Sequence, residues 1–271
     1  ININFQLLAI NMTILNSKYL KKNPDSKVIY LPKIFFNSIA KSKSEIQKLK
    51  DLINKNKKVI IFKNVVDKNI IKIIEKNRNH VMKSKPFFFK TFLGSDDLYI
   101  FNKENKKSHV KGYFKKIELY PWNHKNKKTY NSLKKIINLK CKMDSLSFNL
   151  HKKKGFFDQK KFIKLQLNHY PFKKGFLNKH IDGIHKKILV LHIGMNNKLN
   201  KDVKGGLIFH FNNKKINIDK YLGPGDVAIF NPIVPHEVTP PNSRSGRWSL
   251  LVSSGYFGKT KGTKLQSKQI N

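Results

Sequence analysis

Residues 223–236 read GPGDVAIFNPIVPH, which is a Gly-Pro-Gly turn, a short apolar run, a second turn at Asn231-Pro232 and a histidine. Gly and Pro interrupt regular structure, and the run between the two turns has the length of one strand. The same alternation of short strands and turns starts near residue 162 and continues to residue 256. Because no helical period separates these runs, the pattern predicts antiparallel sheets in a sandwich or barrel.

The two halves of the chain differ in their predicted elements. Six strands are predicted in the second half: 162–170, 188–195, 205–211, 215–222, 226–232 and 246–256. In the first half we predict helices at 44–56, 67–79 and 129–141, a strand at 59–66, and strands with loops over 87–122. Ser44 and Gln47 predict a capping box for the first helix. Early helices and late strands, without βαβ alternation, favour a jelly roll with an N-terminal α-helical buttress.

The length is compatible with a single domain over residues 1–271. Within it we expect a helical, aromatic-rich part over 12–150 and a jelly-roll core over 160–256. Residues 1–11 precede the first methionine and are interpreted as a non-native or disordered leader. They lack the basic region of a signal peptide. No apolar run reaches the roughly 18 residues of a membrane-spanning helix.

The single cysteine, Cys141, excludes an intramolecular disulfide and a Cys-rich metal site. It is typical of a reducing compartment, so a cytoplasmic location is expected.

The net charge of +40 suggests a polyanionic partner, but only three of the 56 basic residues are arginine. Phosphate recognition usually uses the bidentate guanidinium group of arginine. Lys, Asn and Ile are all abundant, as expected for an AT-rich coding sequence. We therefore favour codon bias as the origin of the charge, with nucleic-acid binding as the alternative.

His180 and Asp182 lie in the segment NKHIDGIH, residues 178–185. In extended backbone, positions i and i+2 point to the same side, so one imidazole and one carboxylate can reach the same point. His236 follows the turn after residues 226–232, where a jelly roll would bring it beside that segment. Two histidines and one carboxylate form the facial triad of non-haem Fe(II), so His180, Asp182 and His236 are the predicted metal ligands.

Arg247 is the candidate anion-binding residue. In a strand over 246–256, Arg247 and Ser249 share one face, and a buried arginine is costly unless it meets an anion. Arg244 is the rival, but PNSRSG resembles an exposed turn. Gln166, Asn168 and Tyr170 form a polar face on the predicted strand 162–170, which we expect to line the same cavity.

The ordered set His180-x-Asp182, His236 and Arg247-x-Ser249 resembles the Fe(II)/2-oxoglutarate-dependent dioxygenases, in particular their prolyl-hydroxylase-like branch. The phrases NHYPFKKGFLNKHID, GGLIFHF and GPGDVAIFNPIVPHEV support the resemblance, which covers about 160–256. It implies a double-stranded β-helix that binds Fe(II) and 2-oxoglutarate. Arg247 would bind the distal carboxylate of 2-oxoglutarate, with Ser249 and Tyr170 as further donors.

The resemblance also implies the reaction: O2 and 2-oxoglutarate are consumed, a substrate C–H group is hydroxylated or otherwise oxidised, and succinate and CO2 are released. Ascorbate can support such activity. Related halogenases replace the carboxylate ligand by Gly or Ala, so Asp182 indicates oxidation. A small organic substrate is expected. The alternatives are a nucleic-acid or protein substrate, and a cupin-like jelly roll that binds a metal or an anion without turnover. The sequence carries no signal for the oligomeric state.

Overall fold

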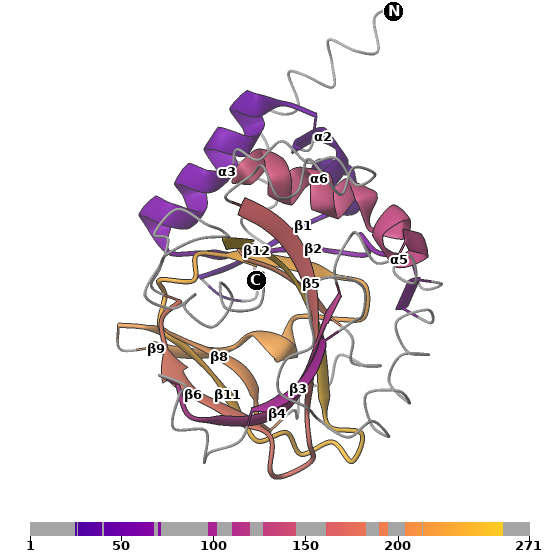
Figure 1. Ribbon diagram of the computed structural model, residues 1–271. Helices are drawn as coiled ribbons and strands as arrows, with labels where there is room; N and C mark the ends of the chain where they lie inside the picture. Colours follow the sequence, from indigo (N-terminus) through magenta and orange to yellow (C-terminus); the bar gives the residue numbers. More distant parts are fainter. Residues whose placement is uncertain are drawn as a thin grey trace, which may run out of the picture.

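The computed structural model shows a β-sandwich covered on one side by helices (Figure 1). It describes residues 25, 27–39, 41–67, 70–71, 97–101, 110–119, 127–144, 161–182, 190–194, 204–212 and 214–256.

The first sheet, sheet A, has the strand order β1-β2-β10-β7-β12-β5-β4, and β3 also pairs with β4. The β1–β2 pair is parallel and the other pairs are antiparallel. The bounds are β1 Val28–Leu31, β2 Val59–Phe62, β3 Asp97–Phe101, β4 Gly112–Leu119, β5 Lys161–Tyr170, β7 Val190–Gly194, β10 Val227–Phe230 and β12 Arg247–Tyr256.

The second sheet, sheet B, continues from β4 in the order β6-β11-β8-β9. Its bounds are β6 Phe176–His180, β8 Gly206–Phe211, β9 Lys214–Asn217 and β11 His236–Thr239. From β5 onward the chain passes back and forth between the sheets, with β5, β7, β10 and β12 in sheet A and β6, β8, β9 and β11 in sheet B. This alternation is that of a double-stranded β-helix, so the predicted jelly roll is confirmed.

Sheet A packs against an apolar cluster on each of its two faces. On the outer face, alternate residues of β5 and β12 join a cluster with the helices; among them are Leu165, Leu167, Leu250 and Val252. The helices are α2 Lys33–Ile39, α3 Lys43–Asn56, α5 Lys127–Ser132 and α6 Lys134–Met143, and in Figure 1 α2, α3 and α6 lie over this face. The predicted helical buttress is therefore present.

The inner face of sheet A looks toward sheet B. A second apolar cluster, which includes Ala228, Phe230, Phe209 and Val238, fills part of the space between the sheets. Because side chains alternate along a strand, β12 sends Trp248 outward and Arg247 inward. This alternation directs the polar face of β5 into the sandwich.

Some sequence predictions were wrong in detail. The N-cap of α3 is Ser42, whose hydroxyl accepts a hydrogen bond from the Glu45 N–H at 3.4 Å, so Ser44 is not the cap. The predicted strand 215–222 ends at Asn217, after which Ile218–Lys220 form a 3-10 helix. The predicted helix 129–141 is broken at Leu133 into α5 and α6.

The helix α2 was not predicted, and neither were three short strands, β1, β6 and β11. At four or five residues they are too short for a clear alternation of apolar and polar residues. Most of the predicted helix 67–79 lies outside the described residues, which include only 67, 70 and 71 of this range, the last two of them helical. Within the described part of the chain, no helix is both long and apolar enough to cross a membrane.

Candidate metal centre

The two candidate imidazole ligands come from neighbouring strands of sheet B. His180 ends β6, His236 begins β11, and the two residues are direct partners in this antiparallel pair. Direct partners lie on the same side of a sheet, and the two ring centroids are 4.3 Å apart. Asp182 follows β6, where its backbone N–H donates to the Pro232 carbonyl at 3.0 Å. The turn at 231–233 thus positions the carboxylate.

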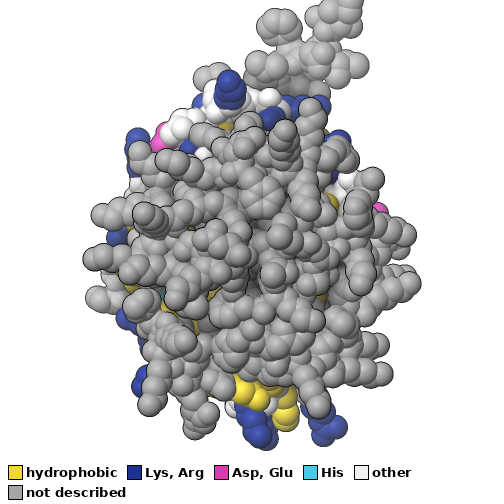
Figure 2. Space-filling view, viewed as in Figure 1, with side chains coloured by type: hydrophobic (Ala, Val, Ile, Leu, Met, Phe, Trp, Pro, Cys, Tyr) yellow, Lys and Arg dark blue, Asp and Glu magenta, His cyan; other side chains and the backbone are white. Residues whose placement is uncertain are grey.

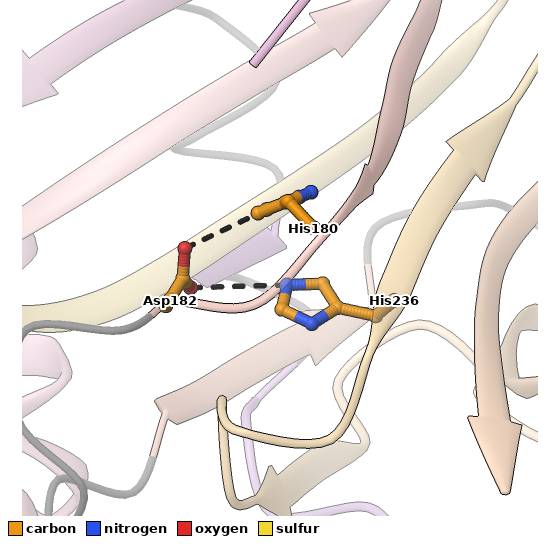
Figure 3. Close-up of side chains that lie close together, drawn as sticks. All are labelled: His180, Asp182 and His236. Atoms are coloured by element: carbon orange, nitrogen blue, oxygen red, sulfur yellow. Dashed lines mark ion pairs between the residues drawn. The ribbon is translucent and has the colours of Figure 1, made fainter. Parts of the chain in front are cut away.

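The three side chains converge on one point (Figure 3). Their candidate ligand atoms all lie within 4.8 Å of one another. Asp182 Oδ1 is 3.5 Å from His180 Nε2, and Asp182 Oδ2 is 3.8 Å from His236 Nε2. Ligand atoms that surround one ion at bonds of roughly 2 Å lie about 3 to 4 Å apart, as in the two pairs that Asp182 forms with the histidines. The group could therefore hold a metal ion.

Hydrogen bonds at the far side of each ring set its orientation. His180 Nδ1 lies 2.7 Å from the Asn178 carbonyl oxygen, and His236 Nδ1 lies 2.9 Å from the Val234 carbonyl oxygen. A carbonyl oxygen only accepts, so Nδ1 carries the proton in both neutral rings. Both Nε2 atoms then present lone pairs toward Asp182. Such a bond to the second nitrogen is the usual support of a metal-binding histidine.

Burial and charge affect the three groups differently. Burial lowers the pKa of His236. Burial also opposes protonation of His180, but the protonated ring donates to both Asp182 and Asn178, which outweighs burial and raises its pKa. Burial would raise the pKa of Asp182, yet the two histidines lower it. The His180 and His236 side chains are 9% and 8% exposed, whereas that of Asp182 is 53% exposed, so the site opens on the carboxylate side.

Metal affinity should depend on a single proton near neutral pH. Metal binding requires neutral His180, and because its pKa is raised above 6.5, protons compete for it at higher pH than for an ordinary histidine. His236 and Asp182, whose pKa values are lowered, have already lost their protons in this range. Zn(II) affinity should be constant above the His180 pKa and fall about tenfold per pH unit below it. Calorimetric titration across neutral pH measures this slope, and a fall near a hundredfold per unit would contradict it.

Arg247 lies on the inner face of sheet A, as expected, and is 2% exposed. The anion that it meets is Asp219, from the 3-10 helix after β9. Its Nε and Nη2 atoms donate to the two oxygens of the Asp219 carboxylate, with the Nη2–Oδ1 pair at 3.0 Å. Burial alone would lower the pKa of Arg247, but Asp219 outweighs burial and raises it, so the guanidinium stays charged.

Asp219 is a residue of this site that the sequence analysis missed. It also accepts the Leu207 N–H at 3.1 Å, and its own N–H donates to the Asn217 side chain at 3.1 Å. A Cβ atom at Gly206 would clash with its carboxylate, and Gly206 has φ +114°, so glycine is required there. The available signal was that a buried arginine needs an anion in a chain with only 16 acidic residues.

The polar face of β5 lines the same space. Tyr170 pairs with Arg247 across the β5–β12 ladder, and the Arg247 Cζ atom lies 5.5 Å from the centre of its ring. Burial raises the pKa of Tyr170, so its phenol stays protonated and can donate a hydrogen bond. Asn168 pairs with Ser249 and is 3% exposed. Gln166, one step further along, is half-buried and pairs with Leu251.

Other candidate residues lie elsewhere. Arg244 is exposed in its turn, as expected. Trp248 faces the helices and stacks on His169 with centroids 4.2 Å apart. His210 Nε2 lies 2.9 Å from the Glu237 carboxylate and is not part of the triad. His185 and the side chain of His192 lie outside the described residues.

Comparison with known proteins supports the fold. No protein-family model and no curated protein matches the sequence. The fold is similar to that of a Pseudomonas putida prolyl-4-hydroxylase, with TM-score 0.50 and 14% identity over 79% of this chain and 99% of that chain. The double-stranded β-helix is thus shared with a prolyl-4-hydroxylase at low sequence identity.

Two further solved structures have lower scores. An oxidoreductase of the 2OG-Fe(II) oxygenase family from Burkholderia pseudomallei has TM-score 0.45 and 12% identity over 79% of this chain and 90% of that chain. A Trichoplax adhaerens prolyl hydroxylase in complex with a hypoxia inducible factor peptide has TM-score 0.44 and 15% identity over 81% of this chain and 92% of that chain.

Proposed function

We propose that this protein is an Fe(II)- and 2-oxoglutarate-dependent oxygenase that hydroxylates, or otherwise oxidises, a small organic substrate. The observation that carries the proposal is the convergence of His180, Asp182 and His236 within 4.8 Å, in a double-stranded β-helix. Two imidazoles and one carboxylate leave coordination positions open on Fe(II), as this chemistry requires.

Iron and 2-oxoglutarate, when bound, supply the oxidation: O2 gives one oxygen atom to the substrate C–H group and the other to succinate, and CO2 is released. The residues of the chain bind and orient these groups. His180 and His236 offer Nε2 atoms that their carbonyl partners hold in place, and Asp182 supplies the single anionic ligand. The 53% exposure of Asp182 leaves that side of the centre open to a substrate.

Arg247 and its neighbours are proposed to hold the distal carboxylate of 2-oxoglutarate. Asp219 takes the side of the guanidinium formed by Nε and Nη2. A guanidinium can bind a second carboxylate at the end formed by Nη1 and Nη2. The ion pair with Asp219 fixes the plane of the group, so that little side-chain freedom is lost when the cosubstrate binds. The protonated Tyr170 phenol is proposed as a further donor.

The test is conversion of 2-oxoglutarate to succinate by the purified protein with Fe(II), ascorbate and O2. Slow turnover without added substrate, abolished when iron is removed with a chelator, is the expected result. A non-catalytic, cupin-like protein would bind Zn(II) but form no succinate with iron, even when a library of small organic molecules is supplied. That outcome would overturn the proposal.

A polyanionic substrate is the second candidate, because the chain carries a net charge of +40. In Figure 2 described Lys and Arg side chains are visible at several places around the edge of the face. Only three of the 56 basic residues are arginine, the residue best suited to bind phosphate, and this scarcity favours the small-molecule proposal. Binding of single-stranded DNA or RNA that falls steeply with salt, together with succinate formation stimulated by the same nucleic acid, would favour the polyanion.

A further inference from the structure

The charges around the proposed cosubstrate site call for a second cation. Asp219 neutralises Arg247, so these two residues together contribute no net charge. With Fe(II) and Asp182 added, the four groups sum to one positive charge, whereas 2-oxoglutarate carries two negative charges. An uncompensated charge in a buried site is costly. A further positive side chain on the inner face of the sandwich would therefore favour binding of the dianion.

Lys116 on β4 occupies such a position. In the ladder β4–β5 it is the direct partner of Asn168, and in the ladder β5–β12 Asn168 is the direct partner of Ser249. Direct partners share a face, so the three residues form a row across the inner face of sheet A. The neighbouring row, which contains Phe114, Tyr170 and Arg247, confirms that this face points inward, since Phe114 stacks on Tyr170 with centroids 4.9 Å apart.

The row also lies toward the metal centre. The Lys116 ammonium is close enough to the Asp182 carboxylate for the two charges to interact. Lys116 is half-buried. Its neighbour Asn168 is 3% exposed, and none of the described residues donates a hydrogen bond to its Oδ1 atom. A buried amide with an unmet hydrogen-bonding atom beside a lysine indicates a place for a polar ligand.

We propose that Lys116 binds the 1-carboxylate of 2-oxoglutarate, at the iron end, while Arg247 binds the distal carboxylate. Successive rows on one face of a strand are about 7 Å apart, which is comparable to the length of a five-carbon dicarboxylate. A half-turn of the Asn168 amide would present its Nδ2 hydrogens to the same carboxylate. The inference rests on the proposed function, because it assigns a second residue to the proposed cosubstrate.

The test measures binding to the Zn(II)-loaded protein, in which no turnover occurs. Lys116→Met should weaken 2-oxoglutarate about ten- to a hundredfold, the range for loss of a hydrogen bond to a charged group. Lys116→Arg should recover part of the affinity. Lys115→Met is the matched control: Lys115 pairs with His169 and faces the outer side, so its loss should leave the affinity unchanged.

Two half-cosubstrates separate the ends of the molecule. The 2-oxopentanoate ion keeps the 1-carboxylate and ketone, whereas 4-oxopentanoate keeps the ketone and the distal carboxylate. Lys116→Met should weaken 2-oxopentanoate by the same factor as 2-oxoglutarate and leave 4-oxopentanoate unchanged. The variant should also bind Zn(II) several-fold more tightly, because a cation near Asp182 has been removed. Damage to the fold would not strengthen metal binding.

Three results would overturn the inference. The first is unchanged 2-oxoglutarate affinity in Lys116→Met, which would leave the proposed function intact. The second is equal weakening of both half-cosubstrates, which would indicate a general effect on the cavity. The third is that the unmodified Zn(II) protein binds neither 2-oxoglutarate nor 2-oxopentanoate, in which case the proposed function fails as well.

Discussion

Asp182→Ala should reduce succinate formation to below about 1% and weaken Zn(II) affinity by more than about 100-fold. Changes to the outer partners of metal ligands already cost 10- to 100-fold, and loss of a direct ligand should cost more. Asp182 supplies the only carboxylate of the three-residue group. Its side chain is 53% exposed, so the substitution should leave the melting temperature nearly unchanged. Calorimetry with Zn(II) and a succinate assay measure the two effects.

Glu237→Ala is the matched control for this substitution. Glu237 is also acidic and lies on β11 next to His236, but its carboxylate pairs with His210 and is not in the triad. This variant should retain Zn(II) affinity and turnover within about twofold, since the Glu237 carboxylate contacts His210 and none of the three candidate metal ligands. Equal losses in the two variants would show that removal of either negative charge weakens metal binding, and the assignment of Asp182 as the metal ligand would fail.

Arg247→Met should raise the KM for 2-oxoglutarate about 30- to 1000-fold, which corresponds to about 2–4 kcal/mol for a lost charge-assisted pair. The contact with Asp219 adds a second effect. The variant leaves the Asp219 carboxylate buried, without the guanidinium. Removal of one partner of a buried ion pair costs about 3–5 kcal/mol of stability. The single variant therefore combines weaker binding with a less stable fold.

The double variant Arg247→Met/Asp219→Asn separates these effects. It removes both charges, and the Asn side chain keeps an oxygen that can accept from the Leu207 N–H. Chemical denaturation should show that most of the lost stability returns, while the affinity for 2-oxoglutarate stays as low as in Arg247→Met. If binding of 2-oxoglutarate also recovers in the double variant, Arg247 acts only through the fold and is not a ligand of the cosubstrate.

Most strands of the second half could be predicted from sequence because they are apolar and bounded by Gly and Pro, whereas β6 and β11 are too short to show a pattern. Alternation along β5 and β12 also predicts which side chains share a face, and the structure places Arg247 and Tyr170 as direct partners. The N-cap of α3 was predicted at the wrong serine for a different reason. Ser42 and Ser44 are both plausible caps, and the choice depends on where the backbone turns helical.

The amino-acid sequence alone determined the strand texture, the inward face of β12 and the ordered set of His180, Asp182, His236 and Arg247, since each follows from local composition and spacing. Only the tertiary structure decided which groups meet: Asp219 with Arg247, and Lys116 with the row beside Asn168. The physical reason is that hydrophobic periodicity and turn-forming residues determine structure over only a few positions. The partner of a buried charge is set by the pairing of strands that are distant in the sequence. No local sequence pattern specifies that pairing.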